Sequence, residues 1–252
     1  MRNRLIICCL STALLTVLTL LFVCKLHQYR DQLRFRLDPL EEYSSGPPSR
    51  PVENGFWIIG DSRAADWAPE QLGFIRTPVC NLGIRGQTSG QVLARLRQDL
   101  HRSKPTCILI QVGINDLKSM GLLEDPSITR NCIRNIRQIL DACEEHDTRA
   151  IYSAIFPPGD VELFRRPFWK AAIADSLVMV NEAIRDACSN RGFIYFDTHH
   201  LLEDPDHPGK ALKAYQSDFL HINAAGYRCI SEALMELLSR TGEDCVDGLT
   251  DQ

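Results

Sequence analysis

The stretch Cys107-Ile-Leu-Ile-Gln-Val-Gly-Ile-Asn115-Asp116 is a short apolar run that ends in a glycine, an asparagine and an aspartate. Runs of this length and composition are typical of strands that are buried on both faces of a parallel sheet. In such sheets, ligands bind beyond the carboxyl ends of the strands. The stretch therefore predicts a central strand with a candidate site at its end.

The regions on either side repeat the pattern of strand followed by helix. Further strands are predicted over residues 56–59, 78–82, 150–156 and 193–196, and helices over 90–100, 128–143, 175–190 and 224–238. Five strands alternating with helices predict an α/β fold, a parallel sheet covered by helices on both sides. If the first strand lies between the second and third, the loops after all three converge.

The N-terminus carries an apolar run from Leu5 to Cys24, about long enough to cross a bilayer as a helix. A buried core helix fits poorly, because the run is apolar on every face. A cleaved signal peptide is a closer alternative, but no A-x-A pattern closes the run, and Val23 disfavours lipidation at Cys24. We interpret the run as an uncleaved, single-pass transmembrane signal anchor.

The charges flanking this run leave its orientation open. Two arginines precede it, whereas four basic residues follow it, and this excess favours a cytoplasmic C-terminal domain. A short basic head before a long domain is instead typical of an anchor that exports the domain. We favour export, to a periplasmic or extracellular location, and keep the cytoplasmic side as the alternative.

Composition and a Pro-rich linker predict the domain organisation. Residues 1–24 are expected to form the cytoplasmic tip and anchor, 25–52 a polar stalk with a Pro-rich end, 53–242 the folded α/β domain and 243–252 a flexible tail. A net charge of −4 gives no reason to expect a nucleic-acid partner. The ten cysteines include no C-x-x-C pair, so metal and cofactor sites are not predicted and the compartment stays open. The oligomeric state is not indicated.

Ser62 follows the first strand in the tight turn Gly60-Asp61-Ser62. A serine hydroxyl becomes a good nucleophile only when a base takes its proton, so an N-cap serine is the ordinary alternative. Backbone N–H groups of Gly86 and Ser62 and the side-chain amide of Asn115 are candidate oxyanion donors. Their ordinary alternatives are turn residues.

His221 is the candidate base and Asp218 its orienting acid. One short loop delivers both groups, and on this argument we place His221 above its competitors, since we find no such carboxylate for them. Those competitors are His199, His200 and His207. Asp197 is a rival acid, better explained as a strand-end loop residue. A surface histidine beside an N-cap aspartate is the ordinary alternative for the favoured pair.

Four motifs in order resemble blocks I, II, III and V of the SGNH (GDSL-type) hydrolase superfamily: Gly60–Ser62, Asn81–Gly86, Gly113–Asp116 and Asp218–His221. The resemblance spans roughly residues 56–238. It implies a three-layer, flavodoxin-like α/β/α sandwich with a Ser62–His221–Asp218 triad, an oxyanion hole from Gly86 and Asn115, and no metal. Family members cleave lipid esters and thioesters or remove acyl groups from sugars.

Two positions depart from the family pattern. Arg63 stands where the family name has Leu, and Ile222 where many members have Pro. Arg63 and Arg85 can be explained by a preference for anionic or sugar-rich substrates, or as solvated surface residues; we favour the second explanation for Arg63. Residues 157–170 carry Phe164, Phe168 and Trp169, which either pack against the sheet edge or form a substrate-facing flap.

These observations predict a membrane-anchored serine esterase that acts on a small-molecule, glycan or lipid ester. We favour a short acyl group, such as O-acetyl on an envelope glycan. A lipid esterase, lysophospholipase or thioesterase is the alternative within the same class. A non-catalytic glycan-binding protein and an acyltransferase are alternatives of other classes.

Overall fold

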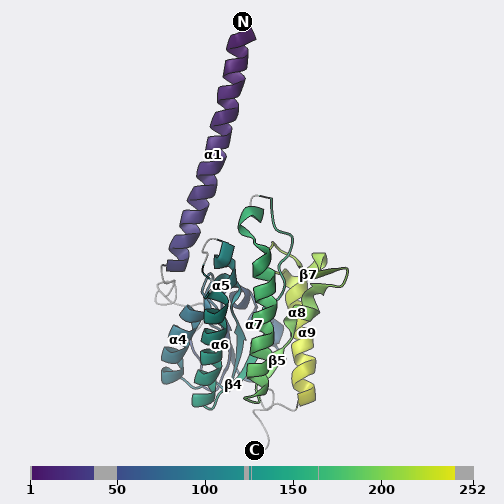
Figure 1. Cartoon of the computed structure of the whole chain (residues 1–252). Coiled ribbons are helices and arrows are strands. Elements are labelled where there is room, and N and C mark those ends of the chain that lie inside the picture. The colour runs from purple at the N-terminus through teal and green to yellow at the C-terminus, as the bar shows by residue number, and fades with distance from the viewer. Residues whose placement is uncertain (1, 37–49, 122–124, 126, 164, 242–252) are drawn as a thin grey trace, which may run out of the picture. The chain divides into compact units, whose positions relative to one another are not determined.

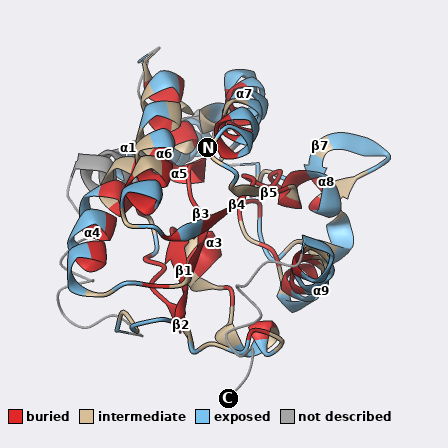
Figure 2. Cartoon of the chain, turned by 90° about the horizontal axis from the view of Figure 1, so that it is seen from below, coloured by how far each residue is buried: buried red, intermediate tan, exposed pale blue. Residues whose placement is uncertain are grey.

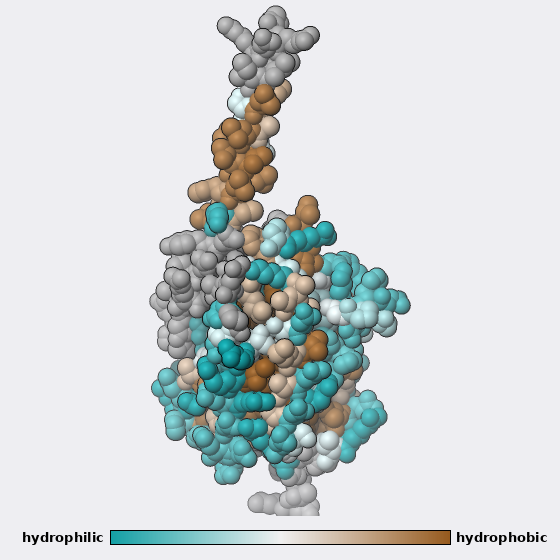
Figure 3. Space-filling model, viewed as in Figure 1, coloured by the Kyte–Doolittle hydropathy of each residue, from teal (hydrophilic) through white to brown (hydrophobic). Residues whose placement is uncertain are grey.

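The computed structural model describes residues 2–36, 50–121, 125, 127–163 and 165–241, in two compact units. The first unit contains helix α1 (Arg2–Arg36). Its window Cys9–Leu26 has a mean hydropathy of 2.1, which makes it long and apolar enough to cross a membrane by length and composition. The helix appears as a brown apolar column in Figure 3. A signal sequence would pass the same test.

The second unit is built on a parallel sheet (Figure 1). Its five strands lie in the order β2-β1-β3-β4-β5, so β1 lies between β2 and β3 as the predicted convergence requires. Their bounds are Phe56–Gly60, Val79–Asn81, Cys107–Gln111, Arg149–Ser153 and Ile194–Phe196 for β1 to β5. The predicted sheet is confirmed, and the loops after β1, β2 and β3 share one edge.

Helices cover both faces of the sheet (Figure 2). Helices α4 (Ser89–Arg102), α6 (Ile128–Glu145) and α7 (Ala171–Ser189) pack on one face, and α9 (Ala224–Thr241) on the other. Alternate residues of β3 enter opposite cores: Ile108 and Ile110 face α4 and α6, while Leu109 packs with α9. The fold is the predicted three-layer α/β/α sandwich.

Helix α7 begins earlier than predicted, at Ala171 instead of residue 175. Alanine-rich sequence favours helix there, and Ile173 is buried in the core, so the added turn is stabilised by packing. Among the residues that the structure describes, five cysteines are buried, as expected for small apolar side chains: Cys80, Cys107, Cys132, Cys143 and Cys188.

Short elements that the periodicity does not predict fill the loops. Three are helices that begin at or just after strand ends: α3 (Ser62–Ala65), α5 (Ile114–Lys118) and α8 (Thr198–Leu202). Strands β6 (Glu203–Asp204) and β7 (His207–Ala211) form an antiparallel hairpin. The 3₁₀ turns are η1 (Pro69–Leu72), η2 (Ser119–Gly121), η3 (Arg166–Phe168) and η4 (Lys213–Tyr215).

The segment after β7 returns across the top of the sheet. Its turn is closed by backbone bonds from the N–H groups of Ser217 and Asp218 to the carbonyl of His221. A bridge between Gln216 and Ile222 continues the pairing into the start of α9. This return carries His221 from beyond the β5 edge to the end of β1.

Candidate active site

Ser62, His221 and Asp218 form one hydrogen-bonded chain. The Ser62 Oγ lies 2.9 Å from His221 Nε2, and His221 Nδ1 lies 2.8 Å from Asp218 Oδ2. The predicted contact between the serine and the histidine is therefore present, across 159 residues of sequence. A hydroxyl, an imidazole and a carboxylate in this order can move a proton from the serine to the histidine.

The turn that holds Asp218 and His221 is organised by the aspartate itself. Its Oδ1 accepts hydrogen bonds from the backbone N–H groups of Leu220, at 2.7 Å, and His221, at 2.8 Å. Partial burial opposes ionisation of this carboxyl group. The hydrogen bonds from the His221 ring and from the two backbone groups outweigh it and hold the Asp218 pKa below its ordinary value. The carboxylate is thus ionised and fixed beside the imidazole.

Gly60 allows the sharp turn before Ser62. Its φ is +152°, and a Cβ at this position would lie 1.8 Å from the Gln111 carbonyl oxygen, so no larger residue fits. The next residue, Asp61, caps α3 by accepting a hydrogen bond from the Arg63 N–H at 2.8 Å. The Asp61 carboxyl is fully buried, and burial raises its pKa to about 7. The turn places Ser62 at the start of α3.

The second motif is fastened to the first by Asn81. The Asn81 side chain donates to the carbonyls of Ala64 and Trp67, both at 2.8 Å, and accepts from the Gly83 N–H at 2.8 Å. Gly83 lies so close to α3 that an added Cβ would be 2.3 Å from the Ala65 nitrogen. The loops after β1 and β2 therefore hold a fixed spacing.

The candidate oxyanion donors come from the second and third motifs. Gly86 has φ +82°, in the region that favours glycine. The Asn115 side-chain amide donates one N–H to the Gln87 carbonyl at 3.0 Å. Because a carboxamide carries two N–H donors, the other can serve a ligand. The Asn115 side chain thus ties the loop containing Gly86 to α5.

Residues in α4 support this arrangement, and sequence reasoning gave them no role. Asp116 Oδ1 accepts from Ser89 Oγ at 2.6 Å, and its Oδ2 from the Ser89 N–H at 2.8 Å. Arg95 donates to Gln87 Oε1 at 2.6 Å and to the Gly60 carbonyl at 3.2 Å. An arginine between two leucines on the apolar face of a helix was the available signal.

The structure contradicts both explanations of Arg63. Its side chain is fully buried, so it is neither a solvated helix-start residue nor a contact for substrate. The Nε–H donates to the Leu220 carbonyl at 2.9 Å, and Nη1–H to the Phe156 carbonyl at 2.8 Å. A charged side chain directly after Ser62 is stable here because buried backbone carbonyls accept hydrogen bonds from its N–H groups. Arg85 is exposed instead and is paired with Asp66.

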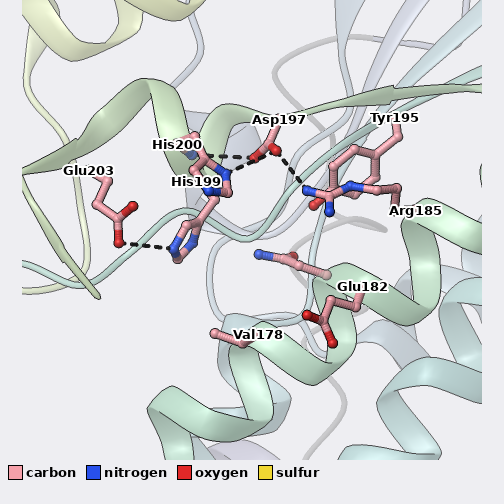
Figure 4. Close-up of a pocket in the computed structure, with 9 residues that line it drawn as sticks. Val178, Glu182, Arg185, Tyr195, Asp197, His199, His200 and Glu203 are labelled. Carbon is pink, nitrogen blue, oxygen red and sulfur yellow. Dashed lines mark hydrogen bonds and ion pairs between the residues drawn. The ribbon is translucent and has the colours of Figure 1, made fainter. Parts of the chain in front are cut away.

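The argument that set His221 apart from its competitors was wrong. His200 Nδ1 lies 3.0 Å from Asp197 Oδ2, and His207 Nδ1 lies 3.0 Å from Asp204 Oδ2, with the same three-residue spacing. Asp197 also accepts from Arg185 at 2.7 Å. Figure 4 shows Asp197, His200 and Arg185 in a separate pocket at the end of β5. Contact with Ser62, which only the folded chain provides, distinguishes His221.

A polar cleft opens beside the Asp218–His221 turn. Its volume is about 630 Å³, which is within the range of small-molecule sites. Polar side chains dominate its wall. Besides Asp218 and His221 they are Asp66, Gln71, Arg85, Ser217, Asn223 and Tyr227. The cleft can receive a hydrophilic group next to the imidazole.

Of the aromatic residues in the segment 157–170, Trp169 follows the packing explanation. Trp169 packs against the hydrophobic core and meets Phe219 edge-on, with ring centroids 5.6 Å apart. Phe168 is half-buried in η3, and Phe164 lies outside the described residues. Because Phe219 belongs to the turn that carries His221, Trp169 packs against that turn. Within the described part of the chain, no group of three or more His, Cys, Asp or Glu is arranged to hold a metal ion.

The sheet order and the hydrogen-bonded serine, histidine and aspartate at its carboxyl edge define the class of α/β serine hydrolases called SGNH or GDSL-type. The chain belongs to the GDSL-like lipase/acylhydrolase family, whose model matches residues 52–229. It is therefore an ester-hydrolysing serine hydrolase. A comparison with curated protein sequences gave no significant match.

Solved structures share the fold at low sequence identity. A GDSL-like lipase from Bacteroides thetaiotaomicron is 20% identical, with a TM-score of 0.66, over 81% of this chain and 98% of the other. A lipase/acylhydrolase from Enterococcus faecalis is 20% identical, with a TM-score of 0.55, over 74% of this chain and 96% of the other. An acetyl-xylooligosaccharide esterase from Geobacillus Stearmophilus, solved as a mutant, is 15% identical, with a TM-score of 0.58, over 80% of this chain and 100% of the other.

Proposed function

We propose that this chain is a membrane-anchored esterase that cleaves carboxylic esters through Ser62, His221 and Asp218. The observation that carries the proposal is the 2.9 Å contact between Ser62 Oγ and His221 Nε2. As Ser62 Oγ bonds to the ester carbonyl carbon, its proton passes to His221 Nε2. Asp218 holds Nδ1 protonated and stabilises the imidazolium that forms.

The tetrahedral intermediate then collapses to an acyl-enzyme. Its oxyanion is stabilised by the N–H groups of Gly86 and Ser62 and by the Asn115 amide, and each such donor is worth about 3 kcal/mol. The bond between the carbonyl carbon and the alcohol oxygen breaks, and His221 gives its proton to that oxygen. His221 then takes a proton from water as the water oxygen bonds to the acyl carbon. The bond from that carbon to Ser62 Oγ breaks, His221 returns the proton to Oγ, and the acid is released.

The favoured substrate is a short acyl ester, such as O-acetyl, on an envelope glycan. The polar wall of the cleft beside His221 supports a hydrophilic alcohol portion. Sugars are recognised by side chains of this kind, which exchange hydrogen bonds with hydroxyl groups. The similarity in fold to an acetyl-xylooligosaccharide esterase is consistent with this substrate class.

A lipid ester is the second candidate. It is favoured by Leu163, whose side chain is 78% exposed in the segment after β4, and by the apolar helix α1, which would keep the site beside lipid. The neighbours named as lipases fit this candidate equally well.

Chain-length preference separates the two substrates. The full chain, purified in detergent, is assayed on nitrophenyl acetate, butyrate, octanoate and palmitate and on an acetylated xylo-oligosaccharide. We expect the highest kcat/KM on acetate and release of acetate from the sugar, both abolished by Ser62→Ala. Preference for palmitate would replace the glycan substrate with a lipid.

Controls address the remaining classes of function. Ser62→Ala activity equal to that of the unmodified chain would refute the role of Ser62. Absence of turnover on every ester, together with no labelling by an organophosphonate, would favour a binding protein. Acetyl transfer to an added sugar in excess of hydrolysis would identify an acyltransferase, because the first half-reaction is shared.

A further inference from the structure

We infer that Arg63 is a positioning residue that holds the His221 turn against Ser62, and the inference rests on the proposed function. Arg63 directly follows Ser62, and its Nε–H donates to the carbonyl of Leu220, which directly precedes His221. Residues next to the nucleophile and next to the base are therefore joined by a hydrogen bond of 2.9 Å.

The contact closes a small ring around the reacting atoms. Starting at Ser62, the ring passes along the chain to Arg63, across its hydrogen bond to Leu220 and along the chain to His221. It returns across the 2.9 Å contact between Nε2 and Ser62 Oγ. Because the ring contains two peptide links and two hydrogen bonds, displacement of the guanidinium displaces the imidazole from the serine.

The His221 turn needs an external tether. Its internal bonds, from Asp218 Oδ1 and to the His221 carbonyl, fix its shape but not its place above the sheet. Strand β5, which precedes this return, is at the opposite edge of the sheet from β2, and two strands, β3 and β4, lie between it and β1. Arg63 supplies a direct link from β1 to the turn, because its guanidinium reaches the Leu220 carbonyl.

The same guanidinium also binds the segment that follows β4. Its Nη1–H donates to the Phe156 carbonyl at 2.8 Å, and its carbon lies 3.9 Å from the centroid of the Phe156 ring. A backbone hydrogen bond from the Gly159 N–H to the Phe219 carbonyl, at 2.9 Å, joins the segment after Phe156 to the His221 turn. Arg63 thus connects the end of β1 with the segment after β4 and with the His221 turn.

The chemical type of the residue supports this role. A fully buried cation has a large desolvation cost, which an apolar side chain of similar length would avoid. What an arginine adds over such a side chain is its rigid set of N–H donors. Two of them bind the carbonyls of Phe156 and Leu220, and the Asp61 carboxyl lies close enough to interact electrostatically with the cation.

The test compares Arg63→Met with Trp67→Phe in the full chain in detergent. Methionine keeps the length of the side chain without its donors. Trp67 is buried in the same segment, and its Nε1–H donates to Ser231 Oγ at 2.9 Å. Its replacement therefore disturbs the core and leaves the Arg63–Leu220 hydrogen bond in place. For each variant we measure the melting temperature and, in a separate sample, the fraction of chains that an organophosphonate labels. The kcat on nitrophenyl acetate is divided by that fraction to give kcat per labelled site, and KM is taken from the same assay.

We expect Arg63→Met to lower kcat per labelled site about 10²-fold with KM within about threefold, because small misplacement of a catalytic group has costs of this size. Trp67→Phe should lower the melting temperature while kcat per labelled site stays within about twofold. Equal kcat per labelled site in Arg63→Met and the unmodified chain would overturn the inference and leave Arg63 a stabilising residue only.

Two further measurements keep the outcomes distinct. If Arg63→Met does not fold, Arg63→Lys, whose ammonium is a more compact donor than the guanidinium fork, is measured in the same way. Reduced kcat with unchanged KM supports the inference, and unchanged kcat overturns it. If the unmodified chain cleaves no ester, the proposed function fails. The rate of phosphonate labelling of Ser62 then tests Arg63, with slower labelling expected in Arg63→Met.

Discussion

Single residues of this chain gain their roles from contacts that their local sequence does not specify. An aspartate three residues before a histidine occurs at Asp218–His221 and also at Asp204–His207, with a similar hydrogen bond in each pair. Only the first of these two pairs lies beside Ser62. The chemistry of a carboxylate–imidazole pair therefore depends on what the far nitrogen of the imidazole touches.

Asp218→Asn is expected to lower kcat about 10²- to 10⁴-fold with little change in KM, because an amide no longer holds His221 in the tautomer that accepts the serine proton. Asp204→Asn is the matched control, since its pair lies in the β6–β7 hairpin with His207 exposed, and it should keep full activity. Steady-state kinetics on nitrophenyl acetate measure both. Equal losses in the two variants would contradict the assignment of Asp218.

Asp61 predicts a pH dependence of stability. Burial raises its pKa from 3.8 to about 7, so the folded state binds a proton that the unfolded state releases. The free energy of unfolding should therefore fall as pH rises from about 4 to 7, by an amount on the order of 4 kcal/mol from this group. Asp61→Asn, which keeps an oxygen acceptor for the Arg63 N–H, should flatten this decline.

Melting temperatures of the full chain between pH 5 and 8 measure the effect. Asp125→Asn is the control, because hydrogen bonds within its own turn, from Ser127, hold the exposed Asp125 pKa below its usual value and its contribution lies at lower pH. A decline of the same slope in Asp61→Asn and the unmodified chain would show that another group is responsible.

At the scale of elements, side-chain hydrogen bonds hold the ends of strands and the starts of the following helices at fixed positions. Asn81 joins β2 to α3, Asn115 joins α5 to the loop before α4, and Arg63 joins α3 to the His221 turn. Each link is a side chain bonded to a backbone carbonyl. Loop positions here are consequently set by hydrogen bonds across elements and not by loop length.

Gly60→Ala is expected to destabilise the chain by more than about 3 kcal/mol, because its Cβ would overlap the Gln111 carbonyl. Gly73→Ala is the control: the nearest atom to its added Cβ is the Glu70 carbonyl oxygen at 3.5 Å, and its cost should be within about 1 kcal/mol. Melting temperatures of the full chain compare the two. A similar loss in both would refute the tight turn at β1.

At the scale of the whole molecule, the proposed anchor determines where the esterase works. We expect the full chain to stay in the membrane fraction after alkaline carbonate extraction and to keep its N-terminal residues, because Cys9–Leu26 can span the hydrocarbon core. A reporter fused after Gln252 should be active only on the exported side. Release by carbonate would contradict the anchor, and activity only in the cytoplasm would reverse its orientation.

Much of the fold was predictable because burial leaves a periodic trace. The apolar run at 107–112 and the amphipathic helix at 128–143 lie where the pattern predicts them, as β3 and α6. Short helices such as α3 and α5 were not predicted, since four or five residues carry no period. Arg63 was misjudged for a related reason: a charged residue reads as solvated until its buried acceptors are known.

The sequence by itself determined the parallel sheet, the order of its motifs and the residue types of an ester-cleaving site, because these follow from local apolar patterns and strand-end chemistry. Only the tertiary structure decided which histidine meets Ser62 and what Arg63 does. Both depend on hydrogen bonds between segments more than 150 residues apart, and such contacts have no local signature.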